Sequence, residues 1–513
     1  MSEESALLEQ AKVSLVGAGP GDPDLISVRG ARLLSEADIV LYDALSHPEL
    51  LDYCPQAEIL DVGKRYGRRA TPQPEITELL LKYAATGKKV VRLKGGDPII
   101  FARGSEEALA LAEAGISFEF VPSSTSAVAA SAFAGIPLTH RELSSSVTLI
   151  TGSDREGKEW SPEAWRKLAT ATGTICVYMG MRRIEEITQA IIDGGRDPST
   201  PAAVIRWGAR PNQRVLVAPV AEIAREARAA GLASPAIIVV GEVVALREKL
   251  RWYDRRPLFG RRVLVPRPRH QAKETAVALR ARGADPLMHP AIELTQAPDP
   301  GLVERTLAQV DRYDWVVFTS ANGARVFCDY LGKHRKDARV LGSARIAVIG
   351  SRTADYLKSR NIIPDLIARE FVAESLAEDL LNIGNLGRVL LLRAEEARDV
   401  LPEQLIASGA IVDVVPAYAT KKVEGEAQAR LLEALEQSLD AVLLTSSSMV
   451  DSLVVACGSQ KSLLDRVALL SIGPITSATM RRHGLQVALE APVHTIEGIL
   501  NAWTEAILEG TFP

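Results

Sequence analysis

The second half of this chain contains an internal repeat, which limits the folds that the chain can adopt. The segment RRVLVPR at Arg261 recurs as GRVLLLR at Gly387, and DWVVFTSANG at Asp314 recurs as DAVLLTSSSM at Asp440, with an offset of 126 residues in both pairs. AVIGSRT recurs as LSIGPIT with an offset of 123 residues. Because each copy of such a repeat forms one supersecondary unit, the sequence predicts two similar α/β lobes.

Hydroxyl side chains lie where the predicted helices of both lobes begin. Strand-like runs end in TSANG, TSSSM, GSRT and GPIT. Helix starts offer backbone N–H groups, so they can bind carboxylates without bulk positive charge. The hydroxyls are either ordinary helix caps or the lining of one cleft, and as a set they favour a substrate-binding cleft. The candidate substrate-binding residues of this kind are Ser320, Thr353, Ser446 and Thr476.

The first half has the alternating pattern of an α/β domain. Its strand-like runs lie at 13–16, 39–42, 90–93, 118–121, 147–151, 174–178, 202–205 and 237–240. A predicted helix from Ser105 carries Glu106 and Glu107 in its first turn, where acids interact favourably with the helix dipole. The charged stretch that follows Val244 predicts a linker at 251–260.

Charge and composition exclude several classes of protein. A net charge of −4 over 513 residues argues against non-specific nucleic-acid binding. No apolar run approaches the roughly 20 residues of a membrane span, and residues 1–12 lack the pattern of a signal peptide, so we expect a cytoplasmic protein without a membrane partner. The four cysteines are scattered without paired spacing, which predicts no metal site.

A glycine-rich turn follows the first strand-like run, in VSLVGAGPGDPDLISVRG from Val13. Gly17, Gly19 and Gly21 would let a ligand press against the main chain. The sixth place of the dinucleotide fingerprint is Asp22, whose carboxylate would repel a pyrophosphate. Two prolines of the turn also remove N–H donors. The turn therefore favours a neutral or cationic ligand over NAD or FAD, and a purely structural turn remains the other alternative.

Three further segments accompany this turn: RLKGGDPIIFARGSEEALAL at Arg92, VPSSTSAVAASAFAGIPLTHR at Val121 and YMGMRRIEEI at Tyr178. With them, the first half resembles the uroporphyrinogen III C-methyltransferases. The second half resembles the uroporphyrinogen III synthases through TSANG, AVIGSRT, LRAEEARDVLPEQL, PAYAT and SIGPITSAT. The two activities would be consecutive steps of tetrapyrrole synthesis.

The resemblance implies two domains, each two-lobed and α/β. The methyltransferase domain would occupy 1–250 and the synthase domain 261–513. In the synthase family the chain passes between the lobes twice, so we expect passages near Ala291 and Ala417. One synthase lobe would then comprise 257–290 plus 421–513, and the other 292–416.

For the first domain, the resemblance implies S-adenosylmethionine as the methyl donor, with no NAD and no metal. A sulfonium cation suits a turn that disfavours phosphates. The implied cofactor-binding residues are Pro20, Gly95, Gly96, Asp97, Ile100, Thr125, Ser126, Met179, Gly208 and Ala236. Asp43 would accept a proton and Lys64 would donate one, unless either is a solvated charge at a strand end.

Methylation at C2 and then C7 would convert uroporphyrinogen III to precorrin-2. The methyltransferases are usually dimeric, so the resemblance implies a homodimer. Ser123 departs from the glycine that the family commonly has after the proline of VP, which leaves the shape of the Thr125 loop open.

For the second domain, the resemblance implies loss of water from hydroxymethylbilane and closure to uroporphyrinogen III with inversion of ring D. Tyr418, in PAYAT, would be the acid that assists the departing hydroxyl, unless it is a hinge tyrosine that only packs. Arg267 would hold a substrate carboxylate. Two alternatives remain: a non-catalytic tetrapyrrole-binding module in this half, and a nicotinamide dehydrogenase, for which no complete GxGxxG follows any strand-like run.

Overall fold

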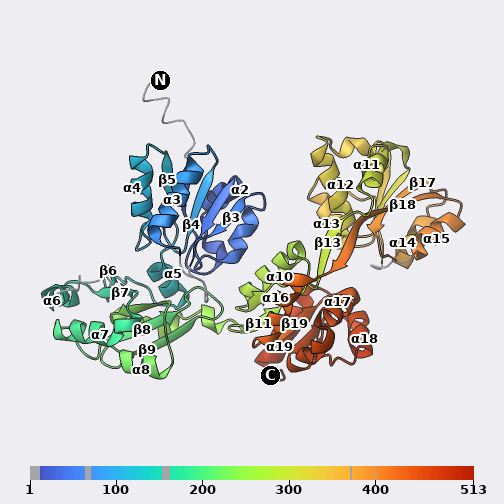
Figure 1. Ribbon diagram of the computed structural model, residues 1–513. Helices are drawn as coiled ribbons and strands as arrows, with labels where there is room; N and C mark the ends of the chain where they lie inside the picture. Colours follow the sequence, from blue (N-terminus) through green and yellow to red (C-terminus); the bar gives the residue numbers. More distant parts are fainter. Residues whose placement is uncertain (1–11, 64–70, 153–161, 370–372, 398, 513) are drawn as a thin grey trace. The chain divides into compact units, whose positions relative to one another are not determined.

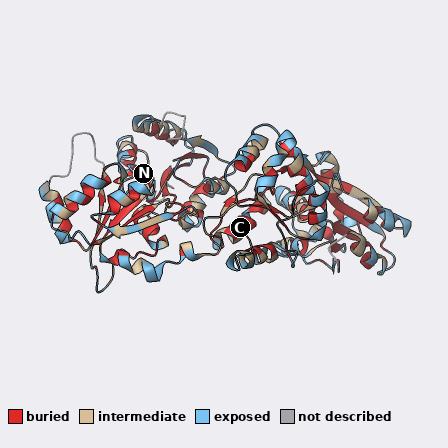
Figure 2. Cartoon of the chain, turned by 90° about the horizontal axis from the view of Figure 1, so that it is seen from below, coloured by how far each residue is buried: buried red, intermediate tan, exposed pale blue. Residues whose placement is uncertain are grey.

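The computed structural model describes residues 12–63, 71–152, 162–369, 373–397 and 399–512 (Figure 1). It contains two compact units. One consists of Met1–Arg261, Leu279–Asp285 and Ala506–Pro513, and the other of Arg262–Ala278 and Pro286–Glu505. Buried residues concentrate in the strands of both units, while the outer faces of the helices are exposed (Figure 2). No helix among the described ranges is long and apolar enough to cross a bilayer.

The first sheet is wholly parallel, with the order β3-β2-β4-β1-β5. Helices α3 and α4 pack on one face, and α2 with the 3-10 turn η2 packs on the other. A sheet covered on both faces leaves its loops free to build a site. The bounds are β1 Val13–Gly17, β2 Ile39–Tyr42, β3 Glu58–Asp61, β4 Val90–Lys94, β5 Phe118–Val121, α2 Val28–Ser35, η2 Pro48–Tyr53, α3 Gln73–Ala84 and α4 Gly104–Glu113.

The second sheet is mixed, with the order β6-β7-β10-β8-β9 and one parallel pair, β6 with β7. Helices α6, α7 and α8 lie against one face, and the alanine-rich helix α5 packs on the other through Ala127 and Ala130. The bounds are α5 Ser126–Phe133, β6 Val147–Thr151, α6 Pro162–Ala171, β7 Thr174–Tyr178, η3 Met181–Arg183, α7 Ile184–Asp193, β8 Pro201–Arg206, β9 Arg214–Pro219, α8 Ile223–Ala229 and β10 Ala236–Val240.

The charged stretch expected to be a linker is packed against α5. It forms η4 (Glu242–Leu246), α9 (Arg247–Leu250) and η5 (Tyr253–Arg255). The indole Nε1 of Trp252 donates to the Ala132 carbonyl oxygen at 2.9 Å, and the ring centroid of Tyr253 lies 4.8 Å from that of Phe133. Its aromatic residues therefore bind this stretch to the first unit despite its charge.

The second half forms two sheets, with the orders β12-β11-β19-β20-β21 and β13-β18-β17-β14-β15-β16. Strands related by the repeat take equivalent places: β11 matches β17, β19 matches β14, and β20 matches β15. The α/β architecture with an internal duplication is therefore as predicted. The strands are β11 Arg262–Leu264, β12 Asp285–Leu287, β13 Ile292–Gln296, β14 Trp315–Phe318, β15 Arg345–Val348, β16 Leu366–Ile367, β17 Arg388–Ala394, β18 Ile411–Lys422, β19 Ala441–Leu444, β20 Ala468–Ser471 and β21 Leu489–Glu490.

Helices cover both of these sheets, and their cores are separate clusters of aliphatic and aromatic residues. The helices are α10 Arg269–Ala281, α11 Pro300–Leu307, α12 Ala321–Lys333, α13 Ser351–Lys358, α14 Ala373–Leu381, α15 Val400–Ala407, α16 Gly425–Glu436, α17 Ser447–Cys457, α18 Pro474–Arg482 and α19 Ile496–Leu508. Short 3-10 turns complete the chain: η1 Pro23–Leu25, η6 Val310–Arg312, η7 Ala338–Leu341 and η8 Gly458–Arg466.

The chain passes between these two sheets through the antiparallel pair β13 and β18 (Figure 1). The first passage leads from β12 into β13 at Ile292. The second follows Lys422, because β18 continues to pair with β13 as far as the register Ile292↔Lys422. Tyr418 lies within this long strand, opposite Gln296.

Gly498 and Gly332 are a matched pair of helix glycines. A Cβ on Gly498, in the first turn of α19, would lie 2.1 Å from the Val493 carbonyl oxygen, whereas one on Gly332, in α12, meets nothing within 4 Å. We expect Gly498→Ala to lower the free energy of unfolding by about 1–3 kcal/mol through overpacking. We expect Gly332→Ala to raise it by about 0.5–1 kcal/mol through helix propensity. Urea unfolding checks both, and an undiminished stability of Gly498→Ala would contradict the packing.

Candidate functional site

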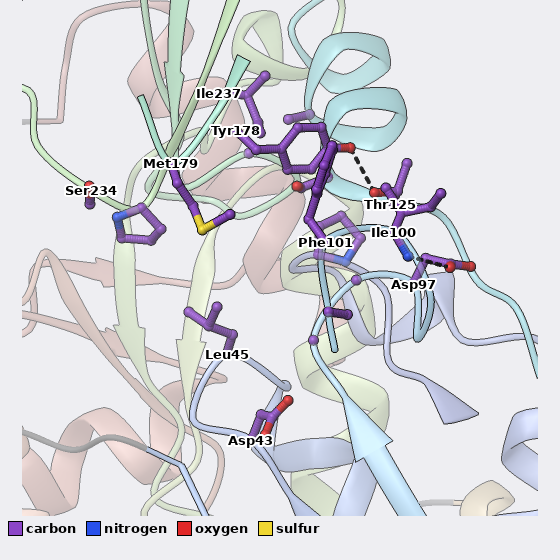
Figure 3. Close-up of a pocket in the computed structure, with 18 of the residues that line it drawn as sticks. Asp43, Leu45, Asp97, Ile100, Phe101, Thr125, Tyr178, Met179, Ser234 and Ile237 are labelled. Carbon is purple, nitrogen blue, oxygen red and sulfur yellow. Dashed lines mark hydrogen bonds between the residues drawn. The ribbon is translucent and has the colours of Figure 1, made fainter. Parts of the chain in front are cut away.

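A cavity of about 660 Å³ lies between the two sheets of the first half (Figure 3). Its lower wall is made by turns at the carboxyl ends of strands of the first sheet, and its upper wall by residues around β7, β8 and the start of β10. This volume is within the range of about 300–1,000 Å³ that is typical of cofactor sites.

The expected cofactor residues come together at this cavity. All ten line it, and so does Asp43. Lys64 falls outside the described residues. The ten are Pro20, Gly95, Gly96, Asp97, Ile100, Thr125, Ser126, Met179, Gly208 and Ala236.

Residues with left-handed backbone angles gather at the same place. Phe101, Met179 and Trp207 have φ values of 51°, 53° and 51°, and all three line the cavity. Such angles cost of order 1–3 kcal/mol each, and they are typical of functional sites because the surrounding structure must hold them. Sequence reasoning missed Phe101 and Trp207, since a left-handed aromatic residue has no periodic pattern. Their one signal is adjacency to Ile100 and Gly208, which were expected in the site.

The glycine-rich turn packs against the protein itself. A Cβ on Gly17 would lie 2.8 Å from the Gly96 carbonyl oxygen, and one on Gly21 would lie 2.7 Å from the Gly208 carbonyl oxygen. Gly19 has a φ of 72°, and its N–H donates to the Gly96 carbonyl at 3.2 Å. The close approach that these glycines allow is therefore made by the protein's own backbone, and Pro20 is the residue of the turn that lines the cavity.

Asp22 has a local structural role. One carboxylate oxygen accepts a hydrogen bond of 3.0 Å from the backbone N–H of Asp24 and so caps η1. Burial raises the pKa of Asp22 above its ordinary value, although the bond from Asp24 opposes this. The carboxylate expected to exclude pyrophosphate thus belongs to the turn rather than to the wall of the cavity.

Asp97 ties the loop after β4 to the loop after β5. Oδ1 accepts from the backbone N–H groups of Ile99 at 3.0 Å and Ile100 at 3.2 Å, and Oδ2 accepts from that of Ser123 at 3.1 Å. Ser123, the departure from the family pattern, also donates its hydroxyl to the Leu25 carbonyl at 3.0 Å. The serine therefore fits this loop by making an additional bond.

Tyr178, at the end of β7, and Thr125, after β5, form a polar contact between the two walls. Their hydroxyls share a hydrogen bond of 2.7 Å, and the backbone N–H of Ala127 donates to the Tyr178 Oη at 3.1 Å (Figure 3). Burial raises the pKa of Tyr178, so its hydroxyl stays protonated at neutral pH. The ring of Phe101 lies beside Tyr178, with 4.8 Å between the centroids, and gives the cavity an aromatic surface.

Asp43 follows β2 and reaches the rim of the cavity, with 29% of its side chain exposed. Its Oδ1 accepts a hydrogen bond of 2.6 Å from Nη2 of Arg92, which is buried in β4. Arg92 also contacts Glu107, and this acid is fully buried. The expectation that Glu107 interacts mainly with the helix dipole is therefore replaced by a buried ion pair.

In the second half, Tyr418 and Ser320 lie side by side. Their hydroxyl oxygens are 3.0 Å apart, and Tyr418 is buried at the end of a hydrophobic core. Ser320 also caps α12 by accepting from the backbone N–H of Gly323 at 3.3 Å. Ser446 caps α17 in the same way through the N–H of Met449 at 3.2 Å. Both serines are helix caps, and Ser320 additionally contacts a tyrosine.

Thr353 and Thr476 are buried in the first turns of α13 and α18. The two helices follow the equivalent strands β15 and β20, so the threonines take matching places in the two sheets. The Tyr418 hydroxyl bonds Ser320, and neither threonine takes part in that contact.

Arg267 is buried without a carboxylate partner among the described residues. Nη2 donates to Gln271 Oε1 at 3.0 Å, Nη1 donates to Thr275 Oγ1 at 3.4 Å, and Nε has no acceptor. Burial, together with the charge of Arg352, lowers the pKa of Arg267 to about 10. A buried charge without an ionic partner is costly, so the position of Arg267 calls for a reason beyond packing.

Known proteins match both halves. Residues 12–224 match the model of the tetrapyrrole (corrin/porphyrin) methylases, and residues 273–501 match that of uroporphyrinogen-III synthase HemD. A "Porphyrin biosynthesis protein HemD" of Ruminiclostridium josui is 37% identical over 501 residues, which are 97% of this chain and 98% of that protein. A "Uroporphyrinogen-III C-methyltransferase" of Bacillus subtilis is 42% identical over 244 residues, covering 47% of this chain and 95% of that protein.

Among solved structures, one similar protein is a uroporphyrin-III C-methyltransferase of Thermus thermophilus complexed with S-adenosylhomocysteine. It is 38% identical, with a TM-score of 0.39, and the match covers 46% of this chain and 93% of that protein's chain. The sequence matches define a fused, bifunctional protein of tetrapyrrole biosynthesis. The chain belongs to the tetrapyrrole methylase family in its first half and to the uroporphyrinogen-III synthase family in its second. Both predicted resemblances are confirmed.

Asp97 allows a test of the cavity wall. We expect Asp97→Ala to release three backbone N–H groups, and a hydrogen bond to a charged group contributes about 1.5–3 kcal/mol. Asp97→Asn retains one carbonyl oxygen and should lose less stability. Amide hydrogen exchange at Ile99, Ile100 and Ser123, followed beside thermal unfolding, checks this. Full protection of all three amides in Asp97→Ala would contradict the wall as described.

Proposed function

We propose that this chain cyclises hydroxymethylbilane to uroporphyrinogen III with inversion of ring D, and methylates uroporphyrinogen III at C2 and C7 to give precorrin-2. The observation that carries the methyl transfer is the convergence of Asp43 and all ten expected cofactor residues on one cavity. The cyclisation is supported by the family of the second half and by the Ser320–Tyr418 pair.

The described residues fit S-adenosylmethionine, which supplies the transferable methyl group when bound. Phe101, Tyr178 and Met179 offer apolar surface to a flat base, and Asp43 places a carboxylate near a sulfonium cation. Pro20 removes an N–H donor that a phosphate would need. The proposed cofactor is therefore cationic and carries no phosphate.

Asp43 is the proposed proton acceptor of methyl transfer. A pyrrole carbon that gains a methyl group carries positive charge until it loses a proton, and a carboxylate at the cavity rim can take that proton. Lys64 remains the proposed proton donor, on its position after β3 in the sequence.

Tyr418 is the proposed acid of the synthase reaction. Its hydroxyl can donate a proton or a hydrogen bond to the hydroxyl that leaves the bilane, while Ser320 positions it. Arg267 would pair with a substrate carboxylate, which its buried guanidinium lacks in the protein. Ser446, Thr353 and Thr476 are proposed to offer hydroxyls to the same polycarboxylate.

The domain division at 1–250 and 261–513, with lobes at 257–290 plus 421–513 and at 292–416, is part of this proposal. So are a homodimer formed through the methyltransferase domain, a cytoplasmic location, and the absence of nucleic-acid or membrane partners. The net charge of −4 supports the last point.

Supplying the purified protein with hydroxymethylbilane and S-adenosylmethionine tests both activities at once. We expect the type III isomer carrying two methyl groups, because the first product is the substrate of the second reaction. Chromatography of the oxidised porphyrins and mass spectrometry measure the isomer and the methyl count. Hydroxymethylbilane closes unaided to the type I isomer, so type I product alone would support a non-catalytic binding module instead.

Asp43→Ala should abolish most methyl transfer and leave cyclisation intact. A correctly placed proton acceptor contributes about 100 to 10,000-fold, so a loss in that range is expected while S-adenosylhomocysteine still binds. Turnover with supplied uroporphyrinogen III and calorimetry of S-adenosylhomocysteine binding measure the two effects. Tyr418→Phe is the matched control, since it should slow cyclisation and leave methylation unchanged. Normal methylation by Asp43→Ala would remove Asp43 from the proposal.

A further inference from the structure

The guanidinium of Arg92 is fixed on every side. Nε donates to Glu107 Oε1 at 3.2 Å, and Nη1 donates to the carbonyl oxygens of Leu41 at 3.4 Å and Leu93 at 3.2 Å. Nη2 donates to Asp43 Oδ1 at 2.6 Å. Only 2% of the arginine side chain is exposed. A planar guanidinium whose nitrogens all donate hydrogen bonds cannot rotate, so it holds a bound carboxylate in one orientation.

Glu107 anchors the inner end of this arrangement. It is fully buried, and both its oxygens accept from Lys94 Nζ at 3.1 Å. Gln73 Nε2 adds a bond of 2.9 Å to Oε1. Burial, with the charge of Arg92, lowers the pKa of Lys94, and Glu107 opposes that shift. The four charges alternate in sign from Lys94 through Glu107 and Arg92 to Asp43.

The order of these four charges determines which ion neutralises each buried charge. Glu107 can neutralise Lys94, which leaves the buried charge of Arg92 to be balanced by Asp43. Asp43 alone reaches the cavity, while the other three lie beneath it. The bond to Arg92 uses Oδ1, and no described residue donates a hydrogen bond to Oδ2. The network therefore holds one carboxylate oxygen and leaves the other available at the rim.

We propose that Arg92 is a positioning residue for methyl transfer, which orients the Asp43 carboxylate toward the acceptor carbon through a guanidinium locked by Glu107. This inference rests on the proposed role of Asp43. The alternative is that Asp43 serves only as the counter-ion that lets Arg92 be buried. The two differ in what happens when both residues are changed together.

A double-mutant cycle with Arg92→Lys and Asp43→Asn tests the inference. Lysine keeps the charge but lacks the fork, so we expect single-turnover methyl transfer to slow by about 100-fold, the cost of misplacing a reacting group by about 1 Å. Affinity for S-adenosylhomocysteine should stay unchanged. The double variant should be no slower than Asp43→Asn, because Arg92 acts through Asp43. Losses that multiply, or a normal rate in Arg92→Lys, would overturn the inference.

Two further variants keep the test decisive. Arg247→Lys changes a partly buried arginine, which donates to the Ala134 carbonyl and to Asp254 away from the cavity, and should lower stability without slowing methyl transfer. Where Arg92→Lys fails to fold, Glu107→Gln loosens the same guanidinium and should give the same non-additive pattern with Asp43→Asn. A normal rate in Asp43→Asn itself would reject the proposed role of Asp43, which is a separate outcome.

Discussion

Parallel pairing of β1, β2, β4 and β5 brings their carboxyl ends to one edge of one sheet, and the methyltransferase cavity depends on this. Pro20, Asp43, Gly95 and Thr125 each follow a different one of these strands, far apart in the sequence. Helices on both faces bury the strands, so the loops at that edge contribute little to the hydrophobic core and can form a cavity that fits a ligand. The left-handed residues Phe101, Met179 and Trp207 follow β4, β7 and β8, so both sheets contribute turns whose conformation the surrounding structure must hold.

Neighbouring parallel strands whose carboxyl ends meet at one edge also occur in both sheets of the second half. In each sheet, β11 beside β19 and β17 beside β14 are neighbours whose connections lead to opposite sides, and open α/β sheets generally bind ligands at such points. Arg267 follows β11, Ser446 follows β19, and Ser320 follows β14. The repeat therefore accounts for why hydroxyls and a buried guanidinium recur at strand ends.

Local sequence predicted the buried elements well and the exposed or tertiary ones poorly. All eight strand-like runs of the first half are strands, whereas β3 and β9 were missed; both are edge strands in which no residue is fully buried. Glu107 has an ordinary position in a first helical turn, and nothing near it in the sequence shows that Arg92 and Lys94 lie beneath it. The sequence also does not show whether the Asp22 carboxylate faces a ligand or, as observed, caps a turn. The pairings of Glu107 arise only when α4 packs on β4, whereas the bond of Asp22 is local.

The proposed acid of the synthase reaction lies at a departure from the repeat. Ser320 and Ser446 are equivalent caps 126 residues apart, but Ser320 contacts the Tyr418 hydroxyl and Ser446 bonds Ser448. The residue that the repeat aligns with Tyr418 is Ile292, which has no proton to give. Two equal lobes would hold a polycarboxylate equally on both sides, whereas loss of one particular hydroxyl needs an acid on one side. The proposed acid Tyr418 would meet that requirement, and it lies on β18, the strand through which the chain leaves that lobe.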